Sequence, residues 1–209
     1  MNIKSLFWPQ IIYSTSSDFN QRIEVRNFFG YRTLRVNNVT QSGGIVEDIY
    51  KRIIPRLNNG NTINNILILG FGAGSFAKLV QKKYPLVKIV GVEIDKIVIN
   101  VARKYFAIRK INNLKIIITD AFNFIKTNKK KFDLVFVDLY VGEKISVTQI
   151  DEKKFFGNLE KSLAKKGVVI FNCINFKKYQ NTNEEFLKNL RGIFTHVATK
   201  KVYSNLIVY

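Results

Sequence analysis

Cysteine and histidine are nearly absent: the 209 residues include one of each, Cys173 and His196. A disulfide framework needs paired cysteines, and a clustered metal site needs several cysteine or histidine ligands. The composition therefore excludes both, and we expect no bound metal. Cys173 lies in the apolar run 168–174 and is expected to be a buried small hydrophobic residue. His196 lies near the start of a late predicted strand and is expected to be structural.

Long apolar runs are also missing. No stretch approaches the roughly 20 apolar residues that a membrane helix needs. Residues 1–9 are too few, and too interrupted by Pro9, to form a secretory signal peptide. We therefore expect a cytoplasmic protein that does not contact a membrane. A chain of 209 residues fits one domain with a small extension and can bury a core.

Acidic residues are scarce beside basic ones, 15 against 34, which gives a formal net charge of +19. A local basic cluster at 126–131 suggests nucleic-acid binding. However, lysine pairs recur along the whole chain, and most phenylalanines occupy apolar periodic positions instead of lying among basic residues, where they could stack on bases. Nucleic-acid binding is left open as an alternative but is not favoured.

The segment from Ile66 to Ser75, Ile-Leu-Ile-Leu-Gly-Phe-Gly-Ala-Gly-Ser, is the most informative part of the chain. Its four leading apolar residues predict a buried strand. Gly70, Gly72 and Gly74 then allow a sharp turn and the close approach of backbone to a ligand. Glu93 ends a second apolar run about 20 residues later, where a carboxylate can accept hydrogen bonds from ribose hydroxyls. The two features together predict a nucleoside pocket.

The glycine spacing distinguishes between two nucleoside ligands. The dinucleotide fingerprint places its third glycine at position 75, where this chain has Ser75, so the pattern is G-x-G-x-G. This favours S-adenosylmethionine (AdoMet) over NAD.

Strand patterns precede an alternating α/β body. Residues 21–26 and 31–36 alternate apolar and polar side chains around a turn, which is typical of a half-exposed hairpin. Apolar residues from Ile45 keep helical spacing until Pro55 and predict a helix. The remaining elements predicted in this part are a turn at 27–30, a short strand at 39–42 and a linker at 58–65.

Beyond the linker, strands and helices alternate, which predicts a parallel sheet with ligands at the carboxyl ends of its strands. Asp95 and Asn183 are predicted to cap helices. The predicted strands are 66–69, 88–92, 115–119, 134–137 and 168–171, with an antiparallel closing pair at 196–203 and 205–209; the predicted helices lie around 76–80, after 95, at 152–164 and at 183–194.

The expected fold class is therefore α/β: a doubly wound, Rossmann-like sheet, mostly parallel with an antiparallel terminal strand, preceded by a small N-terminal β-hairpin extension. We expect residues 1–57 to form the hairpin and helix extension, and residues 58–209 to form the AdoMet-binding domain.

Acidic residues gather at the ends of the predicted strands. Glu93, Asp120 and Asp138 each directly follow an apolar run. A carboxylate at a strand end needs hydrogen-bond partners or water, so three of them predict one polar crevice. The alternative is that such an acid caps the following helix, which applies most to Asp120.

These features resemble the spermidine synthase group of class I AdoMet-type transferases, nearly from end to end. That family has an N-terminal hairpin leading to a Gln, with a Tyr some nine residues later; Gln41 and Tyr50 hold those places here. Its nucleotide motifs match residues 70–74, 92–95 and 120–125. The nucleotide motifs are shared by many methyltransferases, and Gln41 with Tyr50 makes the resemblance more specific.

The resemblance implies a role for each motif. Glu93 would hold the ribose, Asp120 the adenine amino group, and Gln41 the sugar or sulfur end of the cofactor. An attacking amine must also lose a proton, and Asp138 is the best placed acceptor. Tyr140 either orients the acceptor substrate or stacks on it; the alternative is that it is a loop aromatic that packs on the N-terminal extension. The full predicted set is Gln41, Gly70, Gly72, Gly74, Glu93, Ile94, Asp120 and Ala121 for the cofactor, Glu47 and Tyr50 for the substrate, and Asp138 and Tyr140 for catalysis.

Two departures from the family pattern bear on the substrates. Aminopropyltransferases carry Asp where this chain has Ala73, and that carboxylate repels the amino-acid carboxylate of ordinary AdoMet. A second family Asp, three residues after the catalytic one, is replaced here by Val141. The resemblance with these departures predicts an AdoMet-binding alkyl transferase acting on a small amine, with methyl transfer slightly favoured.

Two alternatives remain open at this point. The first is a true polyamine aminopropyltransferase that uses decarboxylated AdoMet, and the second is a non-catalytic basic nucleic-acid-binding protein on the same fold. A homodimer is also left open.

Overall fold

The structure is a computed structural model that describes residues 8–57, 62–139, 152–177 and 180–209. Its contacts divide the chain into two compact units. Unit 1 consists of Met1–Leu57, Phe71–Pro85 and Asp95–Asn112, and unit 2 consists of Asn58–Gly70, Leu86–Ile94 and Asn113–Tyr209. The predicted domain boundary after residue 57 stays a prediction.

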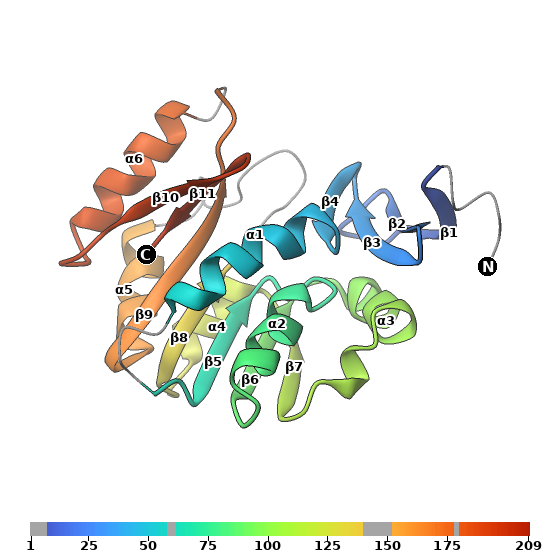
Figure 1. The fold of residues 1–209 in the computed structure, drawn as a ribbon. Helices are drawn as coiled ribbons and strands as arrows, with labels where there is room; N and C mark the ends of the chain where they lie inside the picture. The colour runs from blue at the N-terminus through green and yellow to red at the C-terminus, as the bar shows by residue number, and fades with distance from the viewer. Residues whose placement is uncertain (1–7, 58–61, 140–151, 178–179) are drawn as a thin grey trace. The chain divides into compact units, whose positions relative to one another are not determined.

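Unit 1 contains an antiparallel sheet in the order β1-β2-β3-β4 (Figure 1). Its strands are β1 Gln10–Thr15, β2 Ile23–Phe28, β3 Tyr31–Val36 and β4 Val39–Ser42. The predicted hairpin is confirmed: β2 and β3 pair in register up to Phe28 opposite Tyr31, and Phe29 and Gly30 between them both have positive φ, as a tight hairpin turn requires. The alternating apolar residues Ile23, Val25 and Leu34 are fully buried.

The helices of unit 1 pack through aromatic side chains. They are α1 Ile45–Ile53, η2 Ile54–Arg56, α2 Ser75–Lys83, α3 Lys96–Tyr105 and η3 Ile108–Lys110. Tyr50 of α1 meets Phe76 of α2 edge to face, with ring centroids 5.5 Å apart. Tyr13 of β1 and Tyr105 of α3 have centroids 5.2 Å apart, so β1 contacts α3. The predicted helix start at Ile45 is confirmed, and Pro55 lies in the 3₁₀ turn that ends it.

Unit 2 contains a seven-stranded sheet in the order β10-β11-β9-β8-β5-β6-β7. Its strands are β5 Asn65–Leu69, β6 Lys88–Glu93, β7 Leu114–Ile118, β8 Phe132–Val137, β9 Leu163–Ile174, β10 Thr199–Val202 and β11 Asn205–Val208. The strands from β9 to β7 are parallel, and β11 joins β9 and β10 antiparallel. The predicted fold class is confirmed, including its antiparallel terminal strand.

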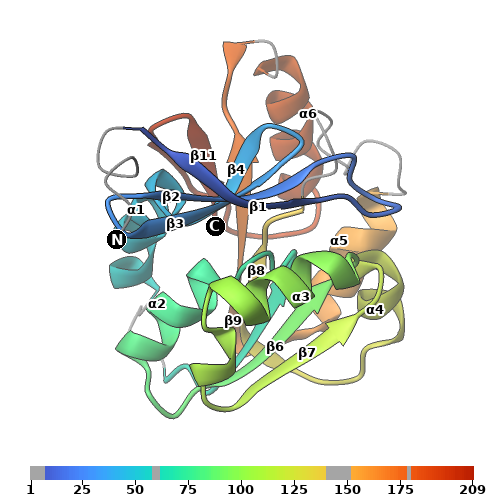
Figure 2. The ribbon, with the colours of Figure 1, turned by 90° about the vertical axis from the view of Figure 1, so that its right-hand side faces the viewer.

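One face of this sheet packs against α4 Ala121–Thr127, α5 Glu152–Lys161 and α6 Gln180–Arg191 (Figure 2). A chain of phenylalanine rings fills the contact: Phe155 meets Phe122 and Phe156, and Phe156 meets Phe171 and Phe186, at centroid distances from 4.4 to 6.0 Å. Cys173 belongs to the same cluster and is 7% exposed, which confirms its predicted burial.

Two expectations need correction. Asn183 does not cap the last helix, because α6 already begins at Gln180 and Asn183 lies buried within it, donating its Nδ2 to the Ile174 carbonyl at 3.0 Å. Strand β1 is absent from the predicted elements although it pairs along its length with β2. None of the helices in the described residues is long and apolar enough to span a membrane.

Candidate functional site

The carboxyl ends of neighbouring parallel strands carry the predicted polar residues of unit 2. Glu93 is the last residue of β6, Asp138 directly follows β8, and Asp120 follows β7 by two residues. Strands β8, β5, β6 and β7 are consecutive in the sheet, with Leu69 opposite both Val137 and Val92. The structure therefore brings the three predicted acids to the same edge of one sheet.

Gly70 marks the point on this edge where the chain's strand order reverses. Its N–H donates to the Val92 carbonyl at 3.0 Å, and the Asp138 N–H donates to the Leu69 carbonyl at 2.8 Å, so the ends of β6, β5 and β8 are tied together. Gly70 has φ +83°, and a Cβ there would lie 2.1 Å from the Asp138 carbonyl oxygen. Strand reversals of this kind are where open α/β sheets bind ligands.

The Glu93 carboxylate is half-buried and turned toward its own backbone, where Oε1 accepts from the Ile94 N–H at 3.0 Å. The Glu93 carbonyl accepts from the Thr119 N–H at 3.0 Å, which fixes the end of β6 against the end of β7. Ile94 is half-buried beside it. These contacts hold the carboxylate on a rigid strand end, the position that a ribose-binding acid needs.

Asp120 caps α4, as the capping alternative expects. Its Oδ1 accepts from the backbone N–H groups of Phe122 at 3.0 Å and Asn123 at 2.9 Å. Both bonds use the same oxygen, and no described residue donates to the other, Oδ2. Ala121, the first residue of the helix, is 6% exposed. Capping therefore orients Asp120 without using its whole acceptor capacity.

Asp138 is bonded to Asn172, which is bonded in turn to Asn205; sequence reasoning missed both asparagines. Asn172 of β9, 8% exposed, donates its Nδ2 to Asp138 Oδ1 at 2.9 Å, and Asn205 of β11 donates its Nδ2 to Asn172 Oδ1 at 2.8 Å. The sequence did offer a signal for Asn172, which is a polar residue within the apolar run 168–174, near the carboxyl end of a strand. Asn205 offered none, because it follows an exposed turn.

Unit 1 places the remaining predicted residues on β4, α1 and the segment that starts α2. Gln41 lies half-buried on β4, and Glu47 lies half-buried in the first turn of α1. Tyr50 is 3% exposed because it packs on Phe76. Gly74 has a left-handed conformation and caps α2, and a Cβ on Gly72 would lie 3.2 Å from the Ser42 hydroxyl.

Two serines that sequence reasoning missed organise this part. The Ala73 N–H donates to Ser42 Oγ at 3.0 Å, and the Gly43 N–H donates to Ser75 Oγ at 3.0 Å. The Ser75 hydroxyl in turn lies 3.4 Å from Glu47 Oε1. The carboxylate of Glu47 is thus held at the first residue of α2, where the helix dipole favours negative charge.

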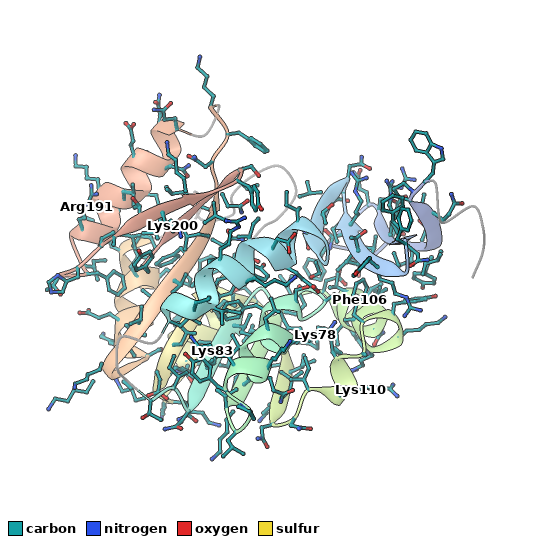
Figure 3. All side chains as sticks on the ribbon, in the orientation of Figure 1. Lys78, Lys83, Phe106, Lys110, Arg191 and Lys200 are labelled. Atoms are coloured by element: carbon teal, nitrogen blue, oxygen red, sulfur yellow. The ribbon has the colours of Figure 1, made fainter. Side chains whose placement is uncertain are left out.

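Lys78, one turn further along α2, interacts electrostatically with Glu47. Its ammonium lies 5.6 Å from the centre of the Phe106 ring (Figure 3). Burial lowers the pKa of Lys78, and the charge of Glu47 raises it by a smaller amount. Among the described residues the two groups form no salt bridge within 4 Å.

Asp95 is confirmed as the N-cap of α3 and does more than was predicted. Its Oδ1 accepts from the N–H groups of Ile97 at 2.8 Å and Val98 at 3.4 Å. Its Oδ2 accepts from Ser17 Oγ at 2.5 Å and Asn20 Nδ2 at 2.7 Å, so the acid also fixes the loop before β2. Asp95, 1% exposed, is structural.

The predicted catalytic Tyr140, together with Val141, lies outside the described residues. Its role stays a prediction from the sequence.

Comparisons with known proteins show which proteins this chain resembles in sequence. Over 204 residues the chain is 26% identical to the polyamine aminopropyltransferase of Buchnera aphidicola subsp. Schizaphis graminum, covering 90% of this chain and 68% of that protein. Over 179 residues it is 31% identical to the polyamine aminopropyltransferase of Sulfurisphaera tokodaii, covering 79% of this chain and 60% of that protein. The chain thus spans about two thirds of these relatives.

The fold has close structural counterparts. The crystal structure of spermidine synthase from Thermotoga maritima superposes with a TM-score of 0.78 at 19% identity, over 95% of this chain and 71% of that one. A family model described as "Spermine/spermidine synthase domain" matches residues 47–206, a range that begins at the predicted substrate residue Glu47 and includes the strand-end acids Glu93, Asp120 and Asp138. With three quarters of its length inside that match, the chain belongs to the spermine/spermidine synthase domain family.

Proposed function

We propose that this chain is an aminopropyltransferase, which moves an aminopropyl group from decarboxylated AdoMet to a small amine. The observation that carries the proposal is the placement of Glu93, Asp120 and Asp138 at one edge of the unit 2 sheet, beside the turn at Gly70. The slight preference for methyl transfer is not supported, because both curated relatives described above are named aminopropyltransferases. The aminopropyl alternative fits these findings better.

The nucleoside end of the donor fits the acids at the ends of β6 and β7. Glu93, on the rigid end of β6, accepts hydrogen bonds from the ribose hydroxyls. Asp120 accepts from the adenine amino group through Oδ2, the oxygen that its capping bonds leave unused. Carboxylate oxygens make strong hydrogen bonds to donors of this kind.

Asp138 serves the acceptor amine. The donor supplies an electrophilic carbon beside its sulfonium. The lone pair of the attacking nitrogen forms a C–N bond to that carbon while the C–S bond breaks, and the sulfur leaves as the neutral thioether of the nucleoside. The Asp138 carboxylate accepts the proton that the amine loses, as a general base. Its position at the end of β8, across Gly70 from Glu93, separates this role from ribose binding.

Donor choice depends on how the chain compensates for Ala73. The Ala73 side chain is fully buried and its N–H is bonded to Ser42, so it offers no charge. Glu47, held on Ser75, places a carboxylate two residues further along the same segment. We assign to Glu47 the attraction of the donor's primary amine and the repulsion of the extra carboxylate of ordinary AdoMet.

Isothermal titration with decarboxylated AdoMet, AdoMet and NAD tests the donor directly. We expect decarboxylated AdoMet to bind most tightly and NAD not to bind. Tighter binding of AdoMet, together with methyl transfer to an amine, would support the methyltransferase alternative, which Ala73 favours. Binding of none of the three would contradict a transferase altogether.

A pair of variants on α1 tests the role of Glu47. Glu47→Gln should reduce the preference for the decarboxylated donor by roughly tenfold, because it removes the negative charge that distinguishes the two donors. A tenfold change corresponds to about 1.4 kcal/mol in the difference between their binding free energies. Asp48→Asn is the matched control, since Asp48 is the next residue, is exposed and pairs with Lys51. An equal change in both variants would show that net charge, and not the placement of Glu47, sets the preference.

A further inference from the structure

A chain of two side-chain amides ends on Asp138. Asn172 and Asn205 lie on the antiparallel strands β9 and β11, where Asn172 is opposite Ile207 and Asn205 is opposite Ile174. Side chains two residues apart on a strand share a face, and so do directly opposite residues. Both amides therefore lie on one face of the sheet, and Cys173, with the aromatic cluster, lies on the other.

The order of bonds fixes the orientation of the Asn172 amide. Its Oδ1 accepts from Asn205 and its Nδ2 donates to Asp138. A flipped Asn172 amide would set its oxygen against the Asp138 carboxylate and its NH₂ against the NH₂ of Asn205, and both contacts would be repulsive. Asn205 therefore adds to the preference for the orientation that directs the Asn172 NH₂ at the carboxylate.

We propose that Asn205 is a positioning residue for Asp138, acting through Asn172. This inference rests on the proposed function for its catalytic consequence. A hydrogen bond donated to a carboxylate favours its ionised form and restricts its rotation, and a general base needs both. Asn205 itself does not contact the reacting atoms; it keeps the Asn172 N–H directed at Asp138.

A pH experiment on Asp138 depends on the titratable groups around it. On β9, Cys173 interacts electrostatically with Asp138, and burial raises the pKa of its thiol to about 12, so it stays neutral across the working range. On β5 the neighbour is Gly70, and on β11 Asn205 and Ile207 lie opposite Ile174 and Asn172 of β9; these residues of β5 and β11 do not titrate. Glu93 and Asp120 lie further along the same edge, on β6 and β7.

The alternative is that the two amides only join β9 to β11. Asn183 provides a matched control, because its amide also donates to β9, at the Ile174 carbonyl, but takes no part in the chain to Asp138. Asn183→Leu should therefore lower stability without changing the behaviour of Asp138.

The experiment compares wild type, Asn205→Leu, Asn205→Asp and Asn183→Leu by two readouts. The first is the pKa of Asp138, followed through its side-chain carboxyl ¹³C signal. We expect both Asn205 variants to raise that pKa, the Asp variant more because its charge adds to the effect, and Asn183→Leu to leave it unchanged. The second is the pH profile of turnover, whose acid limb should move to higher pH, with kcat lower by roughly 10- to 100-fold, as for other groups that orient a functional ligand.

The two readouts separate two kinds of failure. A raised Asp138 pKa in a protein without transferase activity would support the positioning role and contradict the proposed function. An active wild type whose Asn205 variants keep the same Asp138 pKa and the same pH profile would overturn the positioning role. Equal effects from Asn183→Leu would also overturn it, because they would show a general effect of loosening β9.

Discussion

The carbonyl oxygen of Asp138 occupies the space that a side chain on Gly70 would need. A Cβ on Gly70 would lie 2.1 Å from that oxygen, and the Gly70 φ of +83° is itself unfavourable for other residues. The glycine thus permits β5 and β8 to end side by side, and this contact sets the backbone position of the residue that we propose as the general base.

Replacing Gly70 should lower the stability of the folded protein. We expect Gly70→Ala to lower the free energy of unfolding by roughly 2 to 4 kcal/mol, because the backbone must move to relieve both the clash and the strained φ. Urea denaturation followed by circular dichroism measures this. Gly157→Ala is the control: it lies in α5 with nothing within 4 Å of its Cβ, and it should stabilise by about 0.5 to 1 kcal/mol.

Glu93 should control donor affinity. Glu93→Ala leaves the ribose hydroxyls without their acceptor, so donor binding should weaken by about 1 to 3 kcal/mol. Glu93→Gln keeps an oxygen that can accept from the Ile94 N–H, so its donor affinity should fall less than that of Glu93→Ala. Titration calorimetry on both folded variants measures the difference, and an unchanged donor affinity in Glu93→Ala would remove Glu93 from the donor site.

The Cys173 thiol should make stability depend on alkaline pH. Burial, with the charge of Asp138 as a smaller cause, raises its pKa from 9.0 to about 12. The folded state therefore favours the protonated thiol, so this contribution is complete below pH 9 and is lost as the pH rises toward 12. Between these limits wild type should lose up to about 1.4 kcal/mol per pH unit more than Cys173→Ala.

Denaturation curves at pH 8, 10 and 11 compare the two proteins, and the difference between them isolates the thiol from the many lysines that titrate in the same range. Parallel losses of stability would show that Cys173 ionises in the folded protein as easily as in the unfolded chain.

The strands of the sheet could be predicted because their signals are local. Short runs bounded by turn residues located β3 and β4 with their observed bounds, and every strand of unit 2 to within three residues except β9, which begins five residues before its predicted start. Strand β1 was missed because its Ser14 and Thr15 weaken the apolar alternation. Its pairing depends on β2, which begins eight residues after β1 ends.

The site residues also differ in whether a local sequence signal marks them. Glu93, Asp120 and Asp138 could be located because the end of a parallel strand is visible in the sequence. Asn205 could not, because its bond to Asn172 depends on the antiparallel register of β11 on β9, which joins residues 33 positions apart. The error at Asn183 has a related cause: it matched a local capping pattern, but its partner is the Ile174 carbonyl of a strand.

Asp138 should act on the acceptor amine and not on the donor. Asp138→Asn keeps the size of the side chain, and its carbonyl can still accept from Asn172, but it can no longer take a proton. Turnover should fall by roughly 10²- to 10⁴-fold while donor affinity barely changes. Steady-state kinetics with decarboxylated AdoMet and a panel of diamines, combined with donor titration, measure both quantities.

Asp133→Asn is the matched control, because Asp133 lies at the other end of β8, where it accepts from the backbone N–H groups of Asn64 and Asn65 at 2.9 Å. Its loss should lower stability and leave turnover unchanged. If Asp138→Asn instead lost donor binding as severely as Glu93→Ala, Asp138 would belong to the donor site, and the proton acceptor would have to be sought elsewhere in the chain.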